Sequence, residues 1–432
     1  MHRICNLKKM EDVFDELFPI NRSIMGEGYR HSLKILNRLM PTKNIEFNSG
    51  KNIFDWKVPK EWIIEDAYII TPDGKKICDF KKNNLHVVAY SKNINQNISF
   101  ANLKKNLYFI KKNPNAIPYV TSFYKKNWGF CLKYKDYKKL NINGKYKVVI
   151  KSKFKKGKLL VGEAYIKGRT KNEILFTSYL CHPSMANNEL SGPIALSFLY
   201  NYLKKRKKIN NHSIRFIINP ETIGAIAYLS KNYIDLKKRV KAGYVLTCVG
   251  DSGKIHYKET LRGDTITDIA AKNILKKYKH KIMKYSPFGS DERQYNSSGI
   301  KIPIGSLMRT PHGEYKQYHT SLDNKKIINF RKMEEIIKVY VKIFDLLDTD
   351  FIIKPKKNKC EPFLSKYKLY RTVSSYNFHK SDINKIEKNI FIILSKIKNE
   401  SSYLKLLNDT QIEKNIFNKV LKLLKKNEII DY

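Results

Sequence analysis

The sequence predicts an α/β fold in which a sheet is covered by helices on both faces. From Lys145 onward, short apolar runs that suit strands alternate with longer segments of helical spacing. The predicted strands are almost continuously apolar, which is typical of strands that are buried on both faces. A chain of 432 residues is also too long for one compact core, so we expect more than one domain.

Two segments precede this α/β region. Residues 11–40 have the spacing of two amphipathic helices joined by a turn. From about residue 55 to residue 131, short β pieces such as 67–70 and 85–90 alternate with Pro, Gly and Asn. This texture predicts a small β-rich domain.

The α/β region itself supplies the remaining elements. We predict strands at residues 148–151, 159–166, 174–179, 214–218 and 244–249, and helices at 194–205, 223–233, 266–278 and 329–347. The segment after Pro355 differs again and consists of short, highly charged helical pieces. Ligands of such sheets bind at the carboxyl ends of the strands, so polar clusters that follow strands are the candidate site residues.

The chain carries a large positive charge, +45 from 84 Lys and Arg against 39 Asp and Glu. The excess is mostly lysine, runs the whole length, and accompanies abundant Ile, Asn, Tyr and Phe. That distribution favours a coding bias over a dedicated phosphate-binding surface, which would concentrate its charge and use more arginine. We therefore expect no specific nucleic-acid binding.

The sequence predicts a cytoplasmic protein without a membrane span. Its N-terminal residues lack the apolar core of a signal peptide, and no apolar run approaches the ~18–20 residues that cross a bilayer. The six cysteines are isolated, with no CxxC spacing. This pattern favours reduced core thiols over a disulfide framework.

Four polar clusters carry the candidate chemistry. Residues 181–193 supply His182 and Glu189 beyond a strand end, and residues 219–224 supply Glu221 between a strand and a helix. A hydrogen-bonded loop histidine and a glutamate that favours the helix dipole remain the alternatives. Residues 289–293 form a polar turn with two adjacent carboxylates, and residues 313–324 supply His319 before the last long helix.

The order of these clusters resembles that of the zinc aminopeptidases. The strings CHPSMANNELSGP, PETIGAIAYLS, GSDERQY and YHTSLDN further resemble bacterial polysaccharide biosynthesis proteins with an aminopeptidase-like domain. LFPINRSIMGEGY, DWKVPKEW, NNLHVVAYS and IPYVTSFYKKNWGFC extend the resemblance over nearly the whole chain. It implies an aminopeptidase-like mixed sheet covered by helices (1–50 and 133–352), an inserted small β-rich domain (51–132) and a C-terminal winged-helix-like domain (353–432).

The resemblance also implies roles for three residues. His182 and His319 match the two histidine metal ligands of the zinc aminopeptidases, and Glu221 matches their general base. Three other ligand positions are altered, because Asn188, Thr222 and Thr247 stand where carboxylates are expected. A two-metal site needs carboxylates to bridge and balance its cations. We therefore expect one zinc ion per chain rather than two.

Glu189, next to Asn188, would supply the third ligand of that zinc ion. Asp291 and Glu292 are expected on the substrate side, where Asp291 suits a cationic amine. The expected function is metal-dependent hydrolysis of an amide in a small precursor of surface-polysaccharide biosynthesis. A non-catalytic binding module and a simple aminopeptidase are the alternatives.

Three further expectations concern partners. The aromatic residues of the inserted segment either stack on sugar rings or form its core; they are Trp56, Trp62, Tyr90, Tyr119, Tyr124 and Trp128. The winged-helix-like domain is expected to have a structural or protein-contact role. A small amide-bearing molecule is the expected substrate, and the sequence is compatible with a homo-oligomer.

Overall fold

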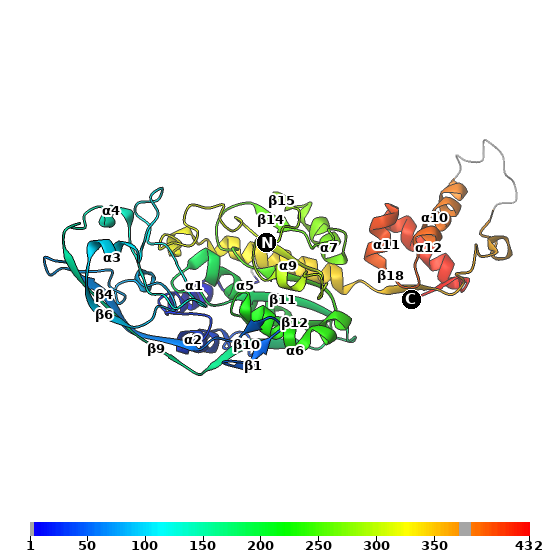
Figure 1. Cartoon of the computed structure of the whole chain (residues 1–432). Helices are drawn as coiled ribbons and strands as arrows, with labels where there is room; N and C mark the ends of the chain where they lie inside the picture. The colour runs from blue at the N-terminus through cyan, green and yellow to red at the C-terminus, as the bar shows by residue number, and fades with distance from the viewer. Residues whose placement is uncertain (1–3, 371–381) are drawn as a thin grey trace.

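The protein is described by a computed structural model that covers residues 4–370 and 382–432. Figure 1 shows an elongated molecule with the main sheet and its helices in the middle. A smaller β-rich lobe lies at one end, and the C-terminal helices lie at the other. The β-rich lobe and the C-terminal segment therefore contact different sides of the central domain.

The central sheet has eight strands in the order β1-β10-β12-β11-β13-β16-β14-β15. They are β1 (Lys43–Asn48), β10 (Lys158–Ile166), β11 (Glu173–Tyr179), β12 (Ser213–Asn219), β13 (Val240–Leu246), β14 (Ile255–Lys258), β15 (His280–Met283) and β16 (Ile304–Met308). The four middle strands, β12, β11, β13 and β16, run parallel, whereas β1, β10 and β14 each pair antiparallel with a neighbour. The predicted mixed α/β architecture is confirmed.

Helices cover both faces of this sheet. They are α1 (Leu7–Leu17), α2 (Glu27–Leu36), α5 (Ser191–Lys204), α6 (Ile223–Arg239), α7 (Ile266–Leu275), α8 (Glu292–Tyr295) and α9 (Phe330–Asp348). Along β12, Phe216 joins the apolar cluster of α5 and α9, while its neighbour Ile217 joins the cluster of α6. Because successive strand residues point to opposite faces, two covered faces require continuously apolar strands.

The β-rich lobe contains a four-stranded sheet in the order β5-β4-β9-β6. Its elements are β2 (Asn52–Ile53), β3 (Trp56–Lys57), β4 (Glu61–Ile70), β5 (Lys76–Ile77), β6 (Ile94–Ser99), α3 (Phe100–Lys104), β7 (Leu107–Tyr108), β8 (Phe130–Cys131), α4 (Tyr134–Tyr137) and β9 (Lys145–Lys155). The strand predicted at residues 148–151 is part of β9 and belongs to this sheet, not to the central one. Its alternation of exposed lysines with buried Tyr146 and Val148 is typical of a sheet with one solvated face.

The β piece predicted at residues 85–90 does not form a strand. A short 3-10 helix occupies Asn84–His86, and only single bridges join Val87 to Phe130 and Ala89 to Thr121. The Asn83 side chain accepts a hydrogen bond from the backbone N–H of Leu85, a local bond of the kind that competes with strand pairing. This turn therefore outweighs the β propensity of the valines.

In its described residues, the C-terminal segment combines the α-helices α10, α11 and α12 with a three-stranded antiparallel sheet, β18-β17-β19. Its elements are β17 (Ile352–Pro355), α10 (Asp382–Lys396), β18 (Ser401–Ser402), α11 (Tyr403–Thr410), α12 (Lys414–Lys426) and β19 (Ile430–Asp431). Lys405 joins it to the central domain through an ion pair with Asp264 (3.1 Å). Its classification as a winged helix stays a prediction.

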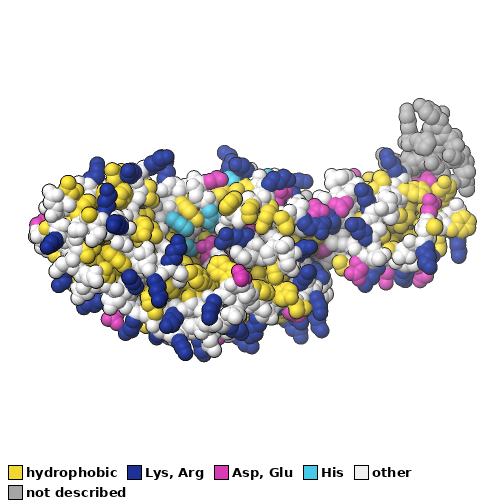
Figure 2. Space-filling model, viewed as in Figure 1, with side chains coloured by type: hydrophobic (Ala, Val, Ile, Leu, Met, Phe, Trp, Pro, Cys, Tyr) yellow, Lys and Arg dark blue, Asp and Glu magenta, His cyan; other side chains and the backbone are white. Residues whose placement is uncertain are grey.

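Three sequence-based expectations concern the surface charge, the cysteines and membrane-spanning helices. Figure 2 shows Lys and Arg side chains spread over the whole visible face, as their distribution in the sequence suggested. All six cysteines are free thiols, and all except Cys360 are buried. Within residues 4–370 and 382–432, no helix is both long and apolar enough to cross a membrane.

Candidate active site

The candidate site is a cavity of about 410 Å³ beside the carboxyl ends of β11 and β12. His182, Glu221 and His319 of the central domain line it together with residues of the inserted segment. Figure 2 shows histidine side chains at the surface between the β-rich lobe and the central domain. His182 and Glu221 follow the ends of β11 and β12, where the strand-end rule places ligand sites, and His319 joins them from the loop before α9.

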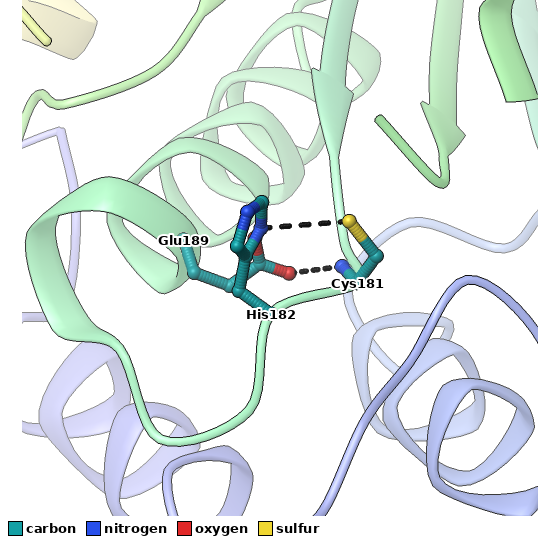
Figure 3. Close-up of side chains that lie close together, drawn as sticks. All are labelled: Cys181, His182 and Glu189. Carbon is teal, nitrogen blue, oxygen red and sulfur yellow. Dashed lines mark hydrogen bonds and ion pairs between the residues drawn. The ribbon is translucent and has the colours of Figure 1, made fainter. Parts of the chain in front are cut away.

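His182 is held by two carboxylates on opposite sides of its ring. Its Nδ1 lies 2.7 Å from Oε2 of Glu189, and its Nε2 lies 3.6 Å from Oε2 of Glu221. Figure 3 shows the imidazole and the Glu189 carboxylate side by side, each with a contact to Cys181. Burial alone would lower the pKa of His182, but Cys181 and Glu189 outweigh it and raise that pKa well above the ordinary value. The surroundings therefore favour a positive charge on the side of Nε2, whether a proton or a cation.

Glu189, which the sequence suggested as a metal ligand, has partners within the protein for both of its carboxylate oxygens. Its side chain is fully buried, and its second oxygen accepts a hydrogen bond from the backbone N–H of Cys181. Both carboxylate oxygens are therefore engaged, one by Cys181 and one by His182. A carboxylate that binds the far nitrogen of a histidine fixes its tautomer and ring orientation, so Glu189 is placed to position His182.

Cys181, His182 and Glu189 also lie close enough together to hold a metal ion by themselves. Burial raises the pKa of the Cys181 thiol to about 11. Nδ1 of His182 and both carboxylate oxygens of Glu189 are already engaged by contacts within this group. The side of His182 that faces Glu221 is therefore the better candidate.

A short helix in the π conformation carries Glu189. Residues Ala186–Leu190 form it directly before α5, and π segments of this kind are frequent at functional sites. Ser191, the first residue of α5, does not cap this helix, because its hydroxyl donates to the carbonyl oxygen of Asn187 (2.6 Å). The π turn buries Glu189 beside the end of β11.

Glu221 precedes a strained turn at the start of α6. The next residue, Thr222, has φ 62° and ψ −71°, an outlier for a β-branched residue. Asp291 holds this turn, because its carboxylate accepts hydrogen bonds from Thr222 N–H (2.7 Å) and from the Asn219 side chain (2.8 Å). Strain of this kind persists only where surrounding contacts fix it, so the contacts of Asp291 position Glu221.

Asp291 and Glu292 lie behind the cavity wall, and neither is among the residues that line the cavity. Both side chains are buried. Glu292 pairs with the buried ammonium group of Lys258 (2.8 Å). Burial, followed by the charge of Glu221, raises the pKa of Asp291 to about 7. The structure thus gives these carboxyls internal partners in place of the expected substrate contacts.

His319 lines the cavity with its ring stacked on Tyr318 at 4.0 Å between centroids. Burial and the neighbouring His182 and His312 lower the pKa of His319 to about 2. Its imidazole is therefore neutral, which is the form that binds metals. The ring centroid of His182 lies 5.2 Å away.

His312 is a histidine close to the site that the sequence reasoning missed. Its Nε2 lies 3.3 Å from the Thr247 hydroxyl and 3.4 Å from the Tyr179 hydroxyl, which donates to the carbonyl oxygen of Asn188. His312 follows β16 by four residues, so the strand-end rule that found His182 could have found it too. Asn188 and Thr247, two of the altered ligand positions, thus form a cluster of neutral side chains with Tyr179 and His312.

Comparison with known proteins places the chain among aminopeptidase-like proteins. The family model "Domain of unknown function (DUF4910)" matches residues 11–350. A relative from Clostridium acetobutylicum, named "Putative polysaccharide biosynthesis protein with aminopeptidase-like domain", is 42% identical over 372 residues, which is 85% of each chain.

Two solved structures have similar folds. A "putative peptidase" from Clostridium acetobutylicum is 37% identical and has a TM-score of 0.79, with 98% of this chain and 96% of that chain covered. A zinc aminopeptidase from Bacillus subtilis is 12% identical and has a TM-score of 0.57, with 79% and 93% covered. The second similarity concerns the fold alone.

Proposed function

This chain belongs to the DUF4910 family, and on that premise we propose that it is a metal-dependent hydrolase of an amide. The observation that carries the proposal is the position of His182, with Glu189 at Nδ1 and Glu221 facing Nε2. The aminopeptidase-like fold of the relatives supports the reaction class. The name of the Clostridium acetobutylicum relative supports a small precursor of surface-polysaccharide biosynthesis as substrate.

The donor set fits one zinc ion. His182 and His319 offer imidazole nitrogens, which zinc prefers as ligands, and the Glu221 carboxylate lies beside His182 as the base. The side chains of Asn188, Thr247 and His312 include no carboxylate that could balance a second cation, and the nearby Asp323 carboxylate accepts hydrogen bonds from the backbone N–H groups of Asn187 and Asn188. When bound, zinc would supply Lewis acidity, which polarises the scissile carbonyl and makes water more acidic.

The residues of the chain divide the remaining tasks. Glu221 accepts a proton from the attacking water as the C–O bond forms, and it returns a proton to the leaving nitrogen as the C–N bond breaks. Asp291 keeps Glu221 in place through the Thr222 turn. Glu189 keeps Nε2 of His182 directed toward Glu221.

We expect about one zinc ion per chain in the purified protein, and we expect its loss in His182→Ala and in His319→Ala. Each substitution removes an imidazole ligand, while the fold retains its large apolar cores. Elemental analysis gives the stoichiometry. His31→Ala, which removes an exposed imidazole from α2, is the control and should keep the metal.

The same measurement can overturn the proposal. A stoichiometry near two would contradict the interpretation of Asn188 and Thr247. A wild-type protein that binds no zinc even when zinc is added would favour a binding module derived from an aminopeptidase. Hydrolysis of simple aminoacyl amides in preference to all acylated sugars would leave an ordinary aminopeptidase.

A second expected result distinguishes a ligand from a positioning residue. Glu189→Gln should weaken zinc binding about 10–100-fold, the usual effect of removing the partner of a ligand histidine. Zinc should still reach one per chain at saturation, because His182 and His319 remain. Titration with a competing chelator measures the affinity. A complete loss of zinc, as in His182→Ala, would instead identify Glu189 as a ligand.

A further inference from the structure

The inserted segment contributes aromatic side chains to the cavity. Trp56 is 38% exposed and Tyr124 is 56% exposed, and their rings meet edge to face at 5.6 Å. Both line the same cavity as His182 and Glu221. Trp62 and Tyr90, by contrast, are buried in the lobe. The structure therefore separates the two interpretations of these aromatic residues, since Trp62 and Tyr90 form core whereas Trp56 and Tyr124 face the cavity.

The cavity also contains a cation for which the described residues provide no carboxylate partner. Arg293 lines it, and one Nη of Arg293 donates a hydrogen bond to the Thr222 hydroxyl (2.9 Å). Its Nε is buried and has no hydrogen-bond partner in the described part of the chain. An unsatisfied buried donor is costly, and a guanidinium group binds two-oxygen anions with particular strength.

The contacts of Arg293 place this cation next to the turn formed by Glu221 and Thr222. Thr222, which receives its hydrogen bond, directly follows Glu221. Asp291, the carboxyl expected to bind a cationic amine, is buried behind the wall and occupied by backbone and Asn219 donors. The charged side chain that a substrate meets next to Glu221 is therefore the positive guanidinium group of Arg293.

We propose that the site selects an amide substrate that carries an anionic group, either a carboxylate or a phosphate. This anionic group binds Arg293. The ring or apolar portion of the same substrate packs against Trp56 and Tyr124. The proposal rests on the proposed amide hydrolysis only for the bond that is cleaved. Recognition of the anionic group is a binding equilibrium, which can be measured without turnover. It makes Arg293 and Trp56 specificity-determining residues.

Binding to the Glu221→Gln protein tests recognition without turnover. Isothermal titration compares two matched pairs of N-acetyl compounds: N-acetylphenylalanine with its neutral amide, and N-acetylglucosamine 1-phosphate with N-acetylglucosamine. We expect the anionic member of at least one pair to bind about tenfold or more tightly than its neutral partner. The pair that shows the preference distinguishes a carboxylate substrate from a phosphate substrate.

Variants of the same protein locate the effect. Arg293→Gln should remove the preference for the anion, and Arg293→Lys should restore part of it because the charge returns without the planar fork. Trp56→Ala should weaken both members of a pair equally. The control is Arg262→Gln, an exposed arginine paired with Asp264, which should change neither affinity. Unchanged melting temperatures show that the variants are folded.

Equal affinity within both pairs, or no binding of either anion at millimolar concentration, would overturn the proposal. Tighter binding of phenylalaninamide, a free amine, would overturn it in favour of an aminopeptidase-like cationic site. The proposed function is judged separately, by turnover in the wild-type protein. An anion preference without turnover would leave the recognition site and remove the hydrolase, whereas turnover without a preference would do the reverse.

Discussion

Glu221→Gln is expected to lower turnover about 10²–10⁴-fold, the usual contribution of general acid–base catalysis. Glutamine has nearly the same size and shape, but its amide cannot accept the proton of the attacking water. Metal content and melting temperature should stay close to wild type. Within the described chain, the only basic group close enough to pair with the Glu221 carboxylate is Nε2 of His182 at 3.6 Å. The Glu221 side chain is 23% exposed, so the loss of its charge should cost the fold little.

The matched control for this experiment is Glu314→Gln, an exposed glutamate in the segment that also carries His319. It should leave turnover unchanged. If Glu221→Gln instead lowers the melting temperature strongly and activity follows the folded fraction, Glu221 stabilises the start of α6 rather than the reaction. That result would restore the helix-dipole interpretation. Single-turnover rates at equal folded concentration distinguish the two outcomes.

The parts of the site that the sequence predicted are those set by chain order. His182 and Glu221 each follow a strand of the central sheet within a few residues, and parallel neighbours bring such positions to one edge. The strands themselves were visible because burial on both faces leaves continuous apolar runs. His319, far along the chain, was found only through the resemblance of its surrounding string.

The parts that the sequence did not predict depend on side-chain direction. Asp291 and Glu292 were expected to face a substrate, whereas in the structure they contact Thr222 and Lys258, which are distant in sequence. Arg293, next in the chain, is the member of that turn that lines the cavity. One residue of difference in a short helix changes which side chain faces the cavity.

The second large effect concerns stability and involves a charged group that the sequence reasoning did not single out. Arg215 on β12 binds Glu173 of β11 in a bidentate manner (2.7 and 2.8 Å) and Glu163 of β10 at 2.5 Å. Tyr228 of α6 receives a further hydrogen bond from it (3.1 Å). Arg215 therefore joins three strands and the helix that follows Glu221.

Arg215→Ala is expected to destabilise the protein by about 3–5 kcal/mol, the scale for removing one partner of a buried ion pair. The loss is large because Glu173 is fully buried. Without Arg215, its described partners would be the Tyr165 hydroxyl at 3.4 Å and Arg239, whose Nη lies 3.8 Å away. Chemical denaturation with a constant m-value measures the change. The restoring variant is Arg215→Ala combined with Glu173→Gln, which removes the uncompensated charge and should recover part of the stability.

Arg239→Ala is the matched control for that prediction. Arg239 is 40% exposed and reaches the same Glu173 carboxylate from the solvent side, and exposed pairs contribute only about 0–1 kcal/mol. If Arg215→Ala costs no more than Arg239→Ala, the buried network does not determine the stability of the sheet. A loss of stability confined to Arg215→Ala would show that this buried network holds together β11 and β12, the strands that precede His182 and Glu221. The two variants remove the same net charge, so their difference would reflect the desolvation of the buried carboxylate.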